Sequence, residues 1–337
     1  MKLTWRRQRL RPKFRFATSQ GGLDEKETIV VTLEHEGIAG QGEATPSKLY
    51  GQTLESTEAA LERIAGLLGD DPLAIEPIVR RMVEHCDDQR AAVAAVDSAL
   101  HDWVGKRLGV PVWRLLGLAR PEARTTYTIG VAAPEEIREK VREALSHGYD
   151  ALKVKVGVEN DEDTLRHIRA QFDGTLILDA NEAWSADEAP RRIDALLPYQ
   201  PAMIEQPLHK HDWRELGKLR GRGAPIFADE SCERPADVVR LHGLVDGVNI
   251  KFSKCGGIRE ALRMVALARG LGMQVMLGCF VCSSLAIAPA LAIVSLADFV
   301  DLDGHLLLAR DPYRGITAHG SMIGLGEAPG LGVAPVD

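Results

Sequence analysis

The run LILDAN (176–181) decides the fold of this chain, together with MIEQP (203–207) and IFADES (226–231) further along. Each run is a short apolar segment that ends in an acid, and the three acids are Asp179, Glu205 and Asp229. They lie 26 and 24 residues apart, which is the length of one strand, loop and helix in a parallel sheet. We therefore expect the three carboxylates to occupy equivalent positions at the ends of neighbouring strands.

The same repeat extends to both sides of these runs. Short apolar segments alternate with amphipathic helices such as 134–147 and 163–172. Eight segments start 21 to 27 residues apart: 125–129, 151–156, 175–179, 202–205, 226–229, 247–251, 274–278 and 299–301. A doubly wound sheet shares this pattern, but acids gathered at one set of strand ends favour a parallel α/β barrel.

The first 118 residues have a different pattern. Two β-runs within 27–45 follow a basic first strand, which predicts a small antiparallel meander. Apolar residues then recur at helical spacing over 56–68, 74–86 and 89–108. We predict an α+β domain over residues 1–118, a barrel over 119–313, and a tail over 314–337 that packs back on the first domain.

Composition limits the class of protein. The net charge of −7 argues against a nucleic-acid partner, so the basic start of the chain is better explained as a strand with one wet face. The most apolar stretch, 285–296, is interrupted by Pro289 and is too short to span a membrane. Five scattered cysteines indicate reduced thiols, and the pair Cys279 and Cys282 lacks two further ligands for zinc. We expect a cytoplasmic protein.

Three converging carboxylates repel one another unless a cation lies among them. An oxygen-only ligand set favours a hard ion such as Mg²⁺, which keeps open positions for a substrate oxygen. The alternative for any one of these acids is that it caps the following helix. Asn181 and Glu230 lie next to the predicted ligands, and we expect them to support the site rather than bind the metal.

A pair of lysines lies on the preceding strand, in ALKVKVG (151–157). Lys153 and Lys155 leave the same face of the strand, about 6.6 Å apart. At an effective dielectric of about 20 their repulsion amounts to roughly 2.5 kcal/mol, which lowers one ammonium pKa by just under two units. The alternative is that both ammonium groups reach solvent at the strand rim.

Lys251 stands at the end of the sixth strand, in VNIKFSKCGG (248–257). In a ring of eight strands the second and sixth lie on opposite sides, so Lys155 and Lys251 could approach a metal-bound substrate from opposite faces. That arrangement suits removal of a proton from one face of a carbon and its return to the other.

These motifs, in this order on successive strands, resemble the muconate-lactonising branch of the enolase superfamily. The resemblance implies a (β/α)7β barrel of the TIM type with an N-terminal capping domain, and Mg²⁺ that stabilises an enediolate. It assigns the acid/base roles to Lys155 and Lys251, with Lys153 lowering the pKa of Lys155 and binding the substrate carboxylate. It also assigns Mg²⁺ to the three strand-end acids, Asp179, Glu205 and Asp229.

The eighth strand, VDLDGHLLLARDP (300–312), resembles the signature of dipeptide epimerases. In that family the pair that corresponds to Asp301 and Asp303 holds the free ammonium of the dipeptide, while Thr128 and Cys279 line the mouth near its backbone. Family members generally have proline where this chain has His305. The resemblance therefore implies an isomerase that inverts the α-carbon of the C-terminal residue of a dipeptide, and we expect it to be a homo-oligomer.

Other functions share the lysines and the metal ligands. An N-acylamino acid racemase, an o-succinylbenzoate synthase or a muconate cycloisomerase would not need an acid pair that binds an ammonium. A dehydratase of the mandelate racemase branch would need a histidine near the seventh strand, where MLGCFVCSS (276–284) has none. A non-catalytic barrel that binds a metabolite is a more remote alternative.

The second residue of the substrate is harder to predict. Ala-Glu epimerases of the family commonly use an arginine from the first capping loop, and here the loop at 18–22 has no arginine. Arg15 or Lys48 could substitute, but we expect a non-acidic or broad preference.

Overall fold

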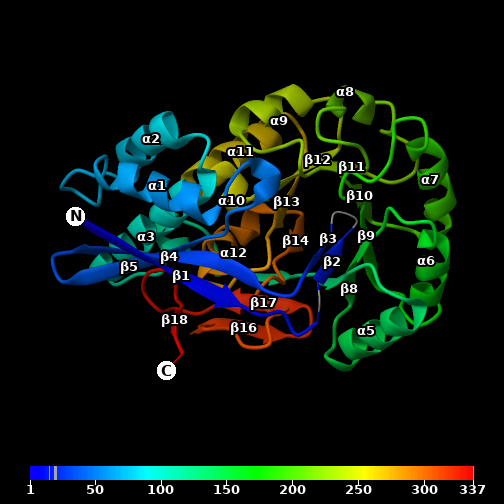
Figure 1. The fold of residues 1–337 in the computed structure, drawn as a ribbon, viewed down its shortest axis with the longest axis horizontal. Coiled ribbons are helices and arrows are strands. Elements are labelled where there is room, and N and C mark those ends of the chain that lie inside the picture. The colour runs from blue at the N-terminus through cyan, green and yellow to red at the C-terminus, as the bar shows by residue number, and fades with distance from the viewer. Residues whose placement is uncertain (15, 19–20, 337) are drawn as a thin grey trace.

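The computed structural model describes residues 1–14, 16–18 and 21–336. Figure 1 shows two parts, an N-terminal sheet with its helices and a ring of parallel strands surrounded by helices. We call the first part the cap. Its elements are β1 (Lys2–Leu10), β2 (Phe16–Thr18), β3 (Gly21–Leu23), β4 (Lys26–His35), β5 (Ile38–Ala44), α1 (Leu54–Ala65), α2 (Ile75–Cys86) and α3 (Arg90–Leu108).

The predicted meander of the cap is confirmed. Its antiparallel strands lie in the order β1-β4-β5, and Glu36 and Gly37 make the tight turn between β4 and β5 at positive φ. Helix α3 packs closely on β5, since a Cβ added to Gly40 or Gly42 would lie 2.1 Å from a carbonyl oxygen of α3. The cap also has its own hydrophobic core, which includes Ile29, Leu33, Leu61 and Leu100.

The first helix starts earlier than its apolar spacing predicted. We expected 56–68, whereas α1 begins at Leu54. Thr53 and Ser56 form a capping box in which Thr53 Oγ1 accepts from Ser56 N at 3.1 Å and Ser56 Oγ accepts from Thr53 N at 2.9 Å. Such a box satisfies backbone N–H groups that have no partner within the helix, and so it sets the helix start.

The barrel contains the eight predicted strands, each parallel to its neighbours. They are β7 (Tyr127–Ile129), β8 (Ala151–Lys155), β9 (Thr175–Asp179), β10 (Met203–Glu205), β11 (Ile226–Ala228), β12 (Gly247–Lys251), β13 (Gln274–Gly278) and β14 (Phe299–Asp301). A hydrogen bond of 3.2 Å from Thr126 N to Val300 O links the last strand to the first. The parallel barrel is therefore confirmed.

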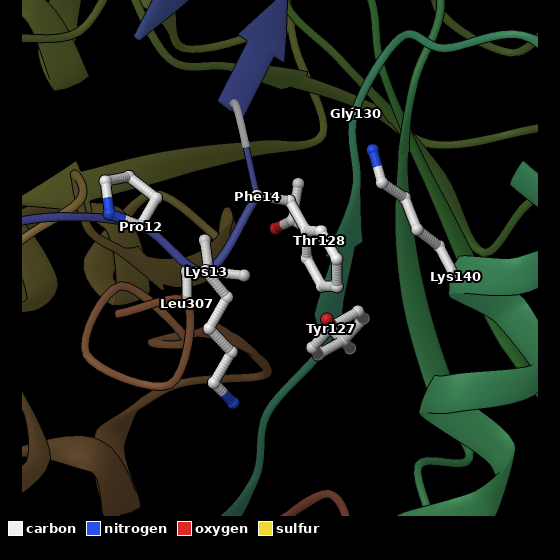
Figure 2. A pocket seen from close by; sticks show the side chains of 8 residues that line it. All are labelled: Pro12, Lys13, Phe14, Tyr127, Thr128, Gly130, Lys140 and Leu307. Atoms are coloured by element: carbon white, nitrogen blue, oxygen red, sulfur yellow. The ribbon is translucent and has the colours of Figure 1, made fainter. Parts of the chain in front are cut away.

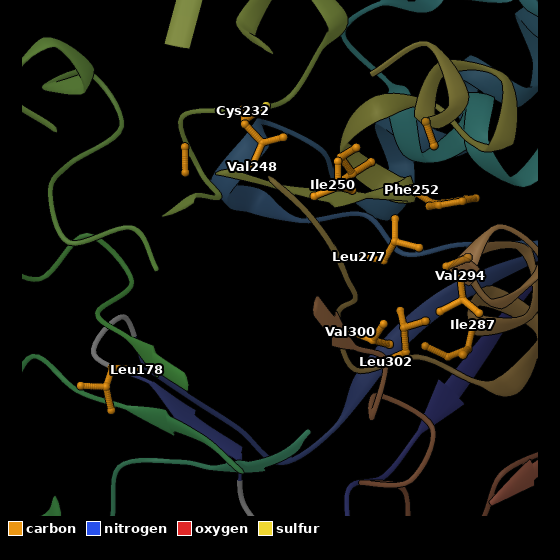
Figure 3. Close-up of a cluster of buried hydrophobic side chains, with 14 of the residues drawn as sticks. Leu178, Cys232, Val248, Ile250, Phe252, Leu277, Ile287, Val294, Val300 and Leu302 are labelled. Atoms are coloured by element: carbon orange, nitrogen blue, oxygen red, sulfur yellow. The ribbon is translucent and has the colours of Figure 1, made fainter. Parts of the chain in front are cut away.

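Helices cover the outside of the ring and bury the outward-facing strand residues. They are α5 (Pro134–Ser146), α6 (Asp161–Arg169), α7 (Ala189–Leu196), η2 (Leu197–Tyr199), α8 (Trp213–Leu216), α9 (Pro235–Leu241), α10 (Phe252–Cys255), α11 (Ile258–Gly270), α12 (Ser284–Ala292) and η3 (Val294–Leu296). Figure 3 shows part of this core, with Leu178, Ile250 and Leu277 of three strands and Ile287 of α12.

The inside of the ring changes character along the strands. Near their amino ends, Ile177, Met203, Phe227 and Met276 form a small apolar layer against which Phe299 packs. Two residues further along several of these strands the inward positions carry charge. Because side chains alternate between the two faces of a strand, every second residue lines the interior.

The tail contacts both parts of the molecule. Its strand β17 (Met322–Leu325) pairs with β16 (Ile316–His319) on one side and with β6 (Glu122–Arg124) on the other, and β15 (Tyr313–Arg314) pairs with β18 (Ala334–Pro335). Leu331 N donates to Asp102 of α3 at 2.8 Å, and Val112 N of α4 (Val112–Leu115) donates to Gly330 O at 2.8 Å. The boundaries at 118 and 313 remain predictions.

Buried polar contacts join the cap to the barrel. Glu43 of β5 accepts hydrogen bonds from the backbone N–H and the hydroxyl of Ser283, which precedes α12. Arg90 of α3 donates to Cys255 O at 2.6 Å, and Asp97 accepts from Ile258 N at 2.5 Å. Across the described ranges, none of the helices has both the length and the apolar character needed to cross a membrane.

Candidate active site

A cavity of about 210 Å³ opens at the carboxyl ends of the barrel strands, beneath the cap. The three predicted lysines line it, as do the predicted substrate contacts Thr128, Cys279, Asp301 and Asp303. The predicted metal ligands Asp179, Glu205 and Asp229 are fully buried around it. The barrel thus gathers residues that are far apart in the sequence at one mouth.

A smaller cavity of about 30 Å³ adjoins this one and shares Thr128 and Leu307 with it. Figure 2 shows Phe14 of the cap beside Thr128 and Tyr127 of β7. The cap therefore contributes to the wall of the active-site region.

Lys153 forms the centre of the charge cluster. Its Nζ lies 2.9 Å from Asp179 Oδ2, 2.9 Å from Glu205 Oε2 and 2.8 Å from Asp301 Oδ2. Its side chain is buried, which would lower its pKa, but Asp179 and Asp301 outweigh the burial and raise the pKa well above its usual range. Lys153 is therefore held as an ammonium ion, and its charge is balanced by acids rather than opposed only by Lys155.

The two predicted acid/base lysines stand on opposite sides of the ring, on β8 and β12. Lys155 Nζ lies 2.7 Å from Asp179 Oδ2, and Lys251 Nζ lies 2.6 Å from Asp229 Oδ2. Burial would lower the pKa of Lys251, but Asp229 outweighs it and raises this pKa. Lys254, in α10, donates to the other oxygen of this carboxylate, Asp229 Oδ1, at 2.5 Å.

The carboxylates differ in how well they are compensated. Burial would raise the pKa of Asp179 and of Asp229, but adjacent lysines outweigh it and hold both pKa values below the usual range. Glu205 and Glu230 have less compensation, so burial raises the pKa of Glu205 to about 7 and that of Glu230 to about 8, with neighbouring acids adding to both shifts.

The donor set fits a divalent cation. Among the described residues, no three acidic, histidine or cysteine side chains are arranged as a metal site, and the Lys153 ammonium lies 2.9 Å from both Asp179 and Glu205. Yet Glu230 Oε2 is buried and has no hydrogen-bond partner in the part of the chain that the structure describes. At and beneath the cavity the acids outnumber the lysines by one. The six acids are Asp179, Glu205, Asp229, Glu230, Asp301 and Asp303, and the five lysines are Lys26, Lys153, Lys155, Lys251 and Lys254. Oxygen donors with excess negative charge suit Mg²⁺.

The two aspartates of the eighth strand are not equivalent. Asp301 accepts from Thr126 Oγ1 at 2.7 Å and from Lys153 Nζ at 2.8 Å, and Lys153 outweighs the effect of burial and lowers its pKa. Asp303 accepts from Thr128 N at 2.8 Å. Burial, together with the neighbouring Asp301, raises the pKa of Asp303 to about 7. Asp303 is thus the member of the pair whose negative charge is less well compensated.

Phe280 and Lys26 also line the cavity, and neither was predicted from the sequence. The Phe280 ring lies 5.0 Å from Lys251 Nζ, and Tyr50 packs edge-on against it. Lys26 Nζ donates to Pro46 O at 2.7 Å, and burial lowers its pKa. The position of Phe280 between Cys279 and Cys282 was the available signal, whereas no local pattern marked Lys26.

Two further expectations concern the capping loops and strand eight. Arg15 and part of the loop at 18–22 lie outside the described residues, and Lys48 is exposed on η1 (Lys48–Tyr50). His305 is buried, its Nδ1 has no hydrogen-bond partner among the described residues, and burial lowers its pKa to about 4. Neutral His305 packs where the family generally has proline.

Comparison with known proteins agrees with this geometry. Residues 3–117 match the family model of the mandelate racemase / muconate lactonizing enzyme N-terminal domain, and residues 136–337 match that of the enolase C-terminal domain-like family. The chain is 37% identical to an L-Ala-D/L-Glu epimerase of Bacteroides thetaiotaomicron, over 100% of this chain and 88% of that protein. It is 36% identical to a hydrophobic dipeptide epimerase of Roseobacter litoralis, over 98% of each.

A solved structure gives the same result for the fold. The dipeptide epimerase of Enterococcus faecalis, complexed with Mg and the dipeptide L-Leu-L-Tyr, superposes with a TM-score of 0.94 at 32% identity, over 98% of both chains. The predicted resemblance is confirmed: this chain belongs to the mandelate racemase / muconate lactonizing enzyme group of the enolase superfamily.

Proposed function

We propose that this protein is a magnesium-dependent dipeptide epimerase, an isomerase that inverts the α-carbon of the C-terminal residue. The observation that carries this proposal is the placement of Lys155 and Lys251 on opposite strands of one mouth, with Asp303 in the same cavity just after β14. Lysines on opposite sides of the cavity suit inversion of a carbon that lies between them. An acidic group elsewhere in the cavity wall suits a free amine.

The proton moves between two lysines in this proposal. One lysine takes the α-proton from one face of the substrate, and the other returns a proton to the opposite face. Lys251, whose pKa Asp229 raises, carries the proton to be returned, so Lys155 serves as the base in that direction. Lys153 stays charged and holds the substrate carboxylate.

The strand-end acids Asp179, Glu205 and Asp229 would hold Mg²⁺. When bound, this ion supplies the concentrated positive charge that a developing negative charge on the substrate carboxylate needs. Thr128 and Cys279 would contact the peptide backbone, and the acid pair Asp301 and Asp303 would bind the amine.

Isotope exchange tests the two-base mechanism. In deuterated buffer with Mg²⁺, a library of dipeptides should show α-deuteration with inversion by mass spectrometry. Lys155→Ala and Lys251→Ala should each lose epimerisation by about 10²–10⁴-fold, the usual contribution of general acid–base catalysis. Each should still exchange the proton of one stereoisomer, and the two should be complementary.

Lys218→Ala, which removes an exposed lysine paired with Glu215, is the matched control and should behave as the wild type. Epimerisation by both active-site variants would contradict the mechanism.

We further propose a homo-oligomer of the cytoplasm that binds no nucleic acid. The five cysteines are free thiols, which supports a reducing compartment. A solution mass of 36.8 kDa by light scattering, which is that of one chain, would contradict the oligomer. The division into residues 1–118, 119–313 and 314–337 belongs to the same proposal, and limited proteolysis near 118 and 313 tests it.

A further inference from the structure

The Cys279 and Cys282 thiols form a pair that takes no part in the proposed proton transfer, although Cys279 lines the cavity. Both follow β13, in a segment that is neither helix nor strand. Cys279 is partly exposed and lines the cavity, whereas Cys282 lies buried directly behind it. Both are free thiols. A small molecule in the cavity can therefore reach the first sulfur but not the second.

The hydrogen bonds around Cys279 Sγ converge on it from two sides. Gly304 N donates to this sulfur at 3.3 Å. The Cys282 thiol is hydrogen-bonded to Cys279, and this bond, together with burial, raises the pKa of Cys282 well above its usual range. Cys282 therefore keeps its proton and donates it. Cys279 Sγ thus accepts a hydrogen bond from Gly304 N and has the second thiol beside it.

The two sulfurs also lie close together in space. A Cβ added to Gly304 would lie 3.1 Å from Cys279 Sγ and 3.2 Å from Cys282 Sγ, so both sulfurs point at the same glycine. Only a residue without a side chain leaves room for them there. An accessible cysteine next to a second thiol is the arrangement found in cysteines that undergo reversible oxidation.

We propose that Cys279 and Cys282 are a site of reversible oxidation by hydroperoxides. The Cys279 thiolate attacks a peroxide oxygen and breaks the O–O bond, which forms a sulfenic acid and releases an alcohol or water. The Cys282 sulfur then attacks Cys279, which forms the disulfide, while its proton and the hydroxyl leave as water. The two sulfurs together lose two electrons and the peroxide gains them. A dithiol reductant reverses the change.

The disulfide would disturb the active site. Its sulfurs approach to about 2.05 Å, which withdraws Cys279 Sγ from Gly304 N. Gly304 directly follows Asp303, and Phe280, which lies beside Lys251, stands between the two cysteines. Oxidation should therefore displace two walls of the cavity and lower kcat/KM.

Peroxide treatment tests the proposal by mass and by activity. Wild-type protein treated with hydrogen peroxide should yield a linked Cys279–Cys282 peptide and the loss of two hydrogens. Its epimerase activity should fall by at least tenfold and return with dithiothreitol. The activity arm rests on the proposed function, whereas the mass arm does not.

Cys282→Ser separates this mechanism from general oxidative damage. The variant should keep its basal activity, form no internal disulfide, and accumulate a sulfenic acid at Cys279 that dimedone traps. Dithiothreitol should no longer restore activity after prolonged peroxide treatment. Cys255→Ser, which removes a buried thiol elsewhere in the barrel, is the matched control and should respond as the wild type does.

Two outcomes would overturn the proposal. One is wild-type protein in which peroxide links neither cysteine while dimedone labels other thiols first. The other is a Cys282→Ser variant whose inactivation by peroxide is as reversible as that of the wild type. If the disulfide forms but no dipeptide is epimerised before treatment, the proposed function fails and the oxidation site stands.

Discussion

The two ends of the barrel interior are built from the same strands, yet they differ completely in chemistry. At the amino end, Ile177, Met203 and Phe227 pack together, and Phe227 meets Phe299 edge-on at 5.4 Å. Two residues further along the same strands, the interior positions are acids: Asp179, Glu205, Asp229 and Asp301. Two residues along each strand thus separate an apolar layer from a charged one.

This difference separates stability from function. Apolar burial at the amino end stabilises the fold by about 25 cal/mol per Å² of surface removed from water. Burial of charge at the mouth costs free energy, and ion pairs recover only part of it. The mouth therefore depends on the rest of the barrel for its stability. A change at the mouth should lower activity more than stability, and a change at the amino end should lower stability more than activity.

Metal removal should have the largest effect, and it acts on the mouth alone. EDTA should abolish turnover, and Glu205→Gln should lower kcat by about 10²–10³-fold or more, because it removes charge that the transition state needs. Glu205 is buried in a cluster with more acids than lysines, so the same variant should not lower Tm in EDTA. Calorimetry beside steady-state kinetics measures both. Full activity without metal would contradict the proposal that the mouth holds a metal ion.

The amino end should show the reverse. Phe227→Ala leaves a cavity in the apolar layer and should cost about 3–5 kcal/mol of unfolding free energy. Its kcat per folded molecule should stay within a few-fold of the wild type. Urea unfolding with activity measured on the folded fraction checks this, and Phe227→Leu is the milder control. A large fall in kcat at unchanged stability would show that the two ends are coupled.

A third test concerns the mouth and removes the positive charge of the substrate amine. Charge-assisted hydrogen bonds contribute about 1.5–3 kcal/mol, so N-acetylation of a good dipeptide should lower kcat/KM by roughly ten- to a hundredfold. Asp303→Asn should impair the free dipeptide to a similar extent and the acetylated one much less. Equal turnover of both compounds by the wild type would favour an N-acylamino acid racemase.

The smallest expected effect is a pH dependence. Burial and the adjacent Asp301 raise the pKa of Asp303 to about 7, so this carboxyl is neutral below that pH and ionised above it. Binding of an ammonium needs the ionised form, and kcat/KM should therefore fall by about tenfold per pH unit below 7, since it reports groups of the free enzyme. Asp303→Asn should flatten this limb of the profile. An unchanged limb would assign it to another group.

The sequence predicted the mouth better than the pairing within it. Asp179, Glu205 and Asp229 could be identified because a repeat of constant length places strand ends in register. The bond between Lys153 and Asp301 joins residues 148 positions apart and depends on how the ring closes, which no local pattern encodes. The prediction of repulsion between Lys153 and Lys155 was therefore incomplete, because it left out the acids from distant strands that surround Lys153.

The cap shows the same limit. Its strands and helices follow from apolar spacing, but Lys26 and Phe280 meet at the cavity only because the cap folds over the barrel. The start of α1 was missed because a Thr-Ser capping box lacks the Glu or Gln that usually marks one.

The contact between Glu43 and Ser283 has a consequence for synthesis on the ribosome. The two residues are 240 positions apart, and at about 5–20 residues per second the second emerges roughly ten seconds to a minute after the first. The cap has its own core, so we expect it to fold during translation. Glu43 would then stay exposed to water until the last third of the chain, which contains Ser283, has been synthesised. Protease resistance of the cap in nascent chains stalled after residue 150 would support this order, and its absence would mean that the cap needs the barrel to fold.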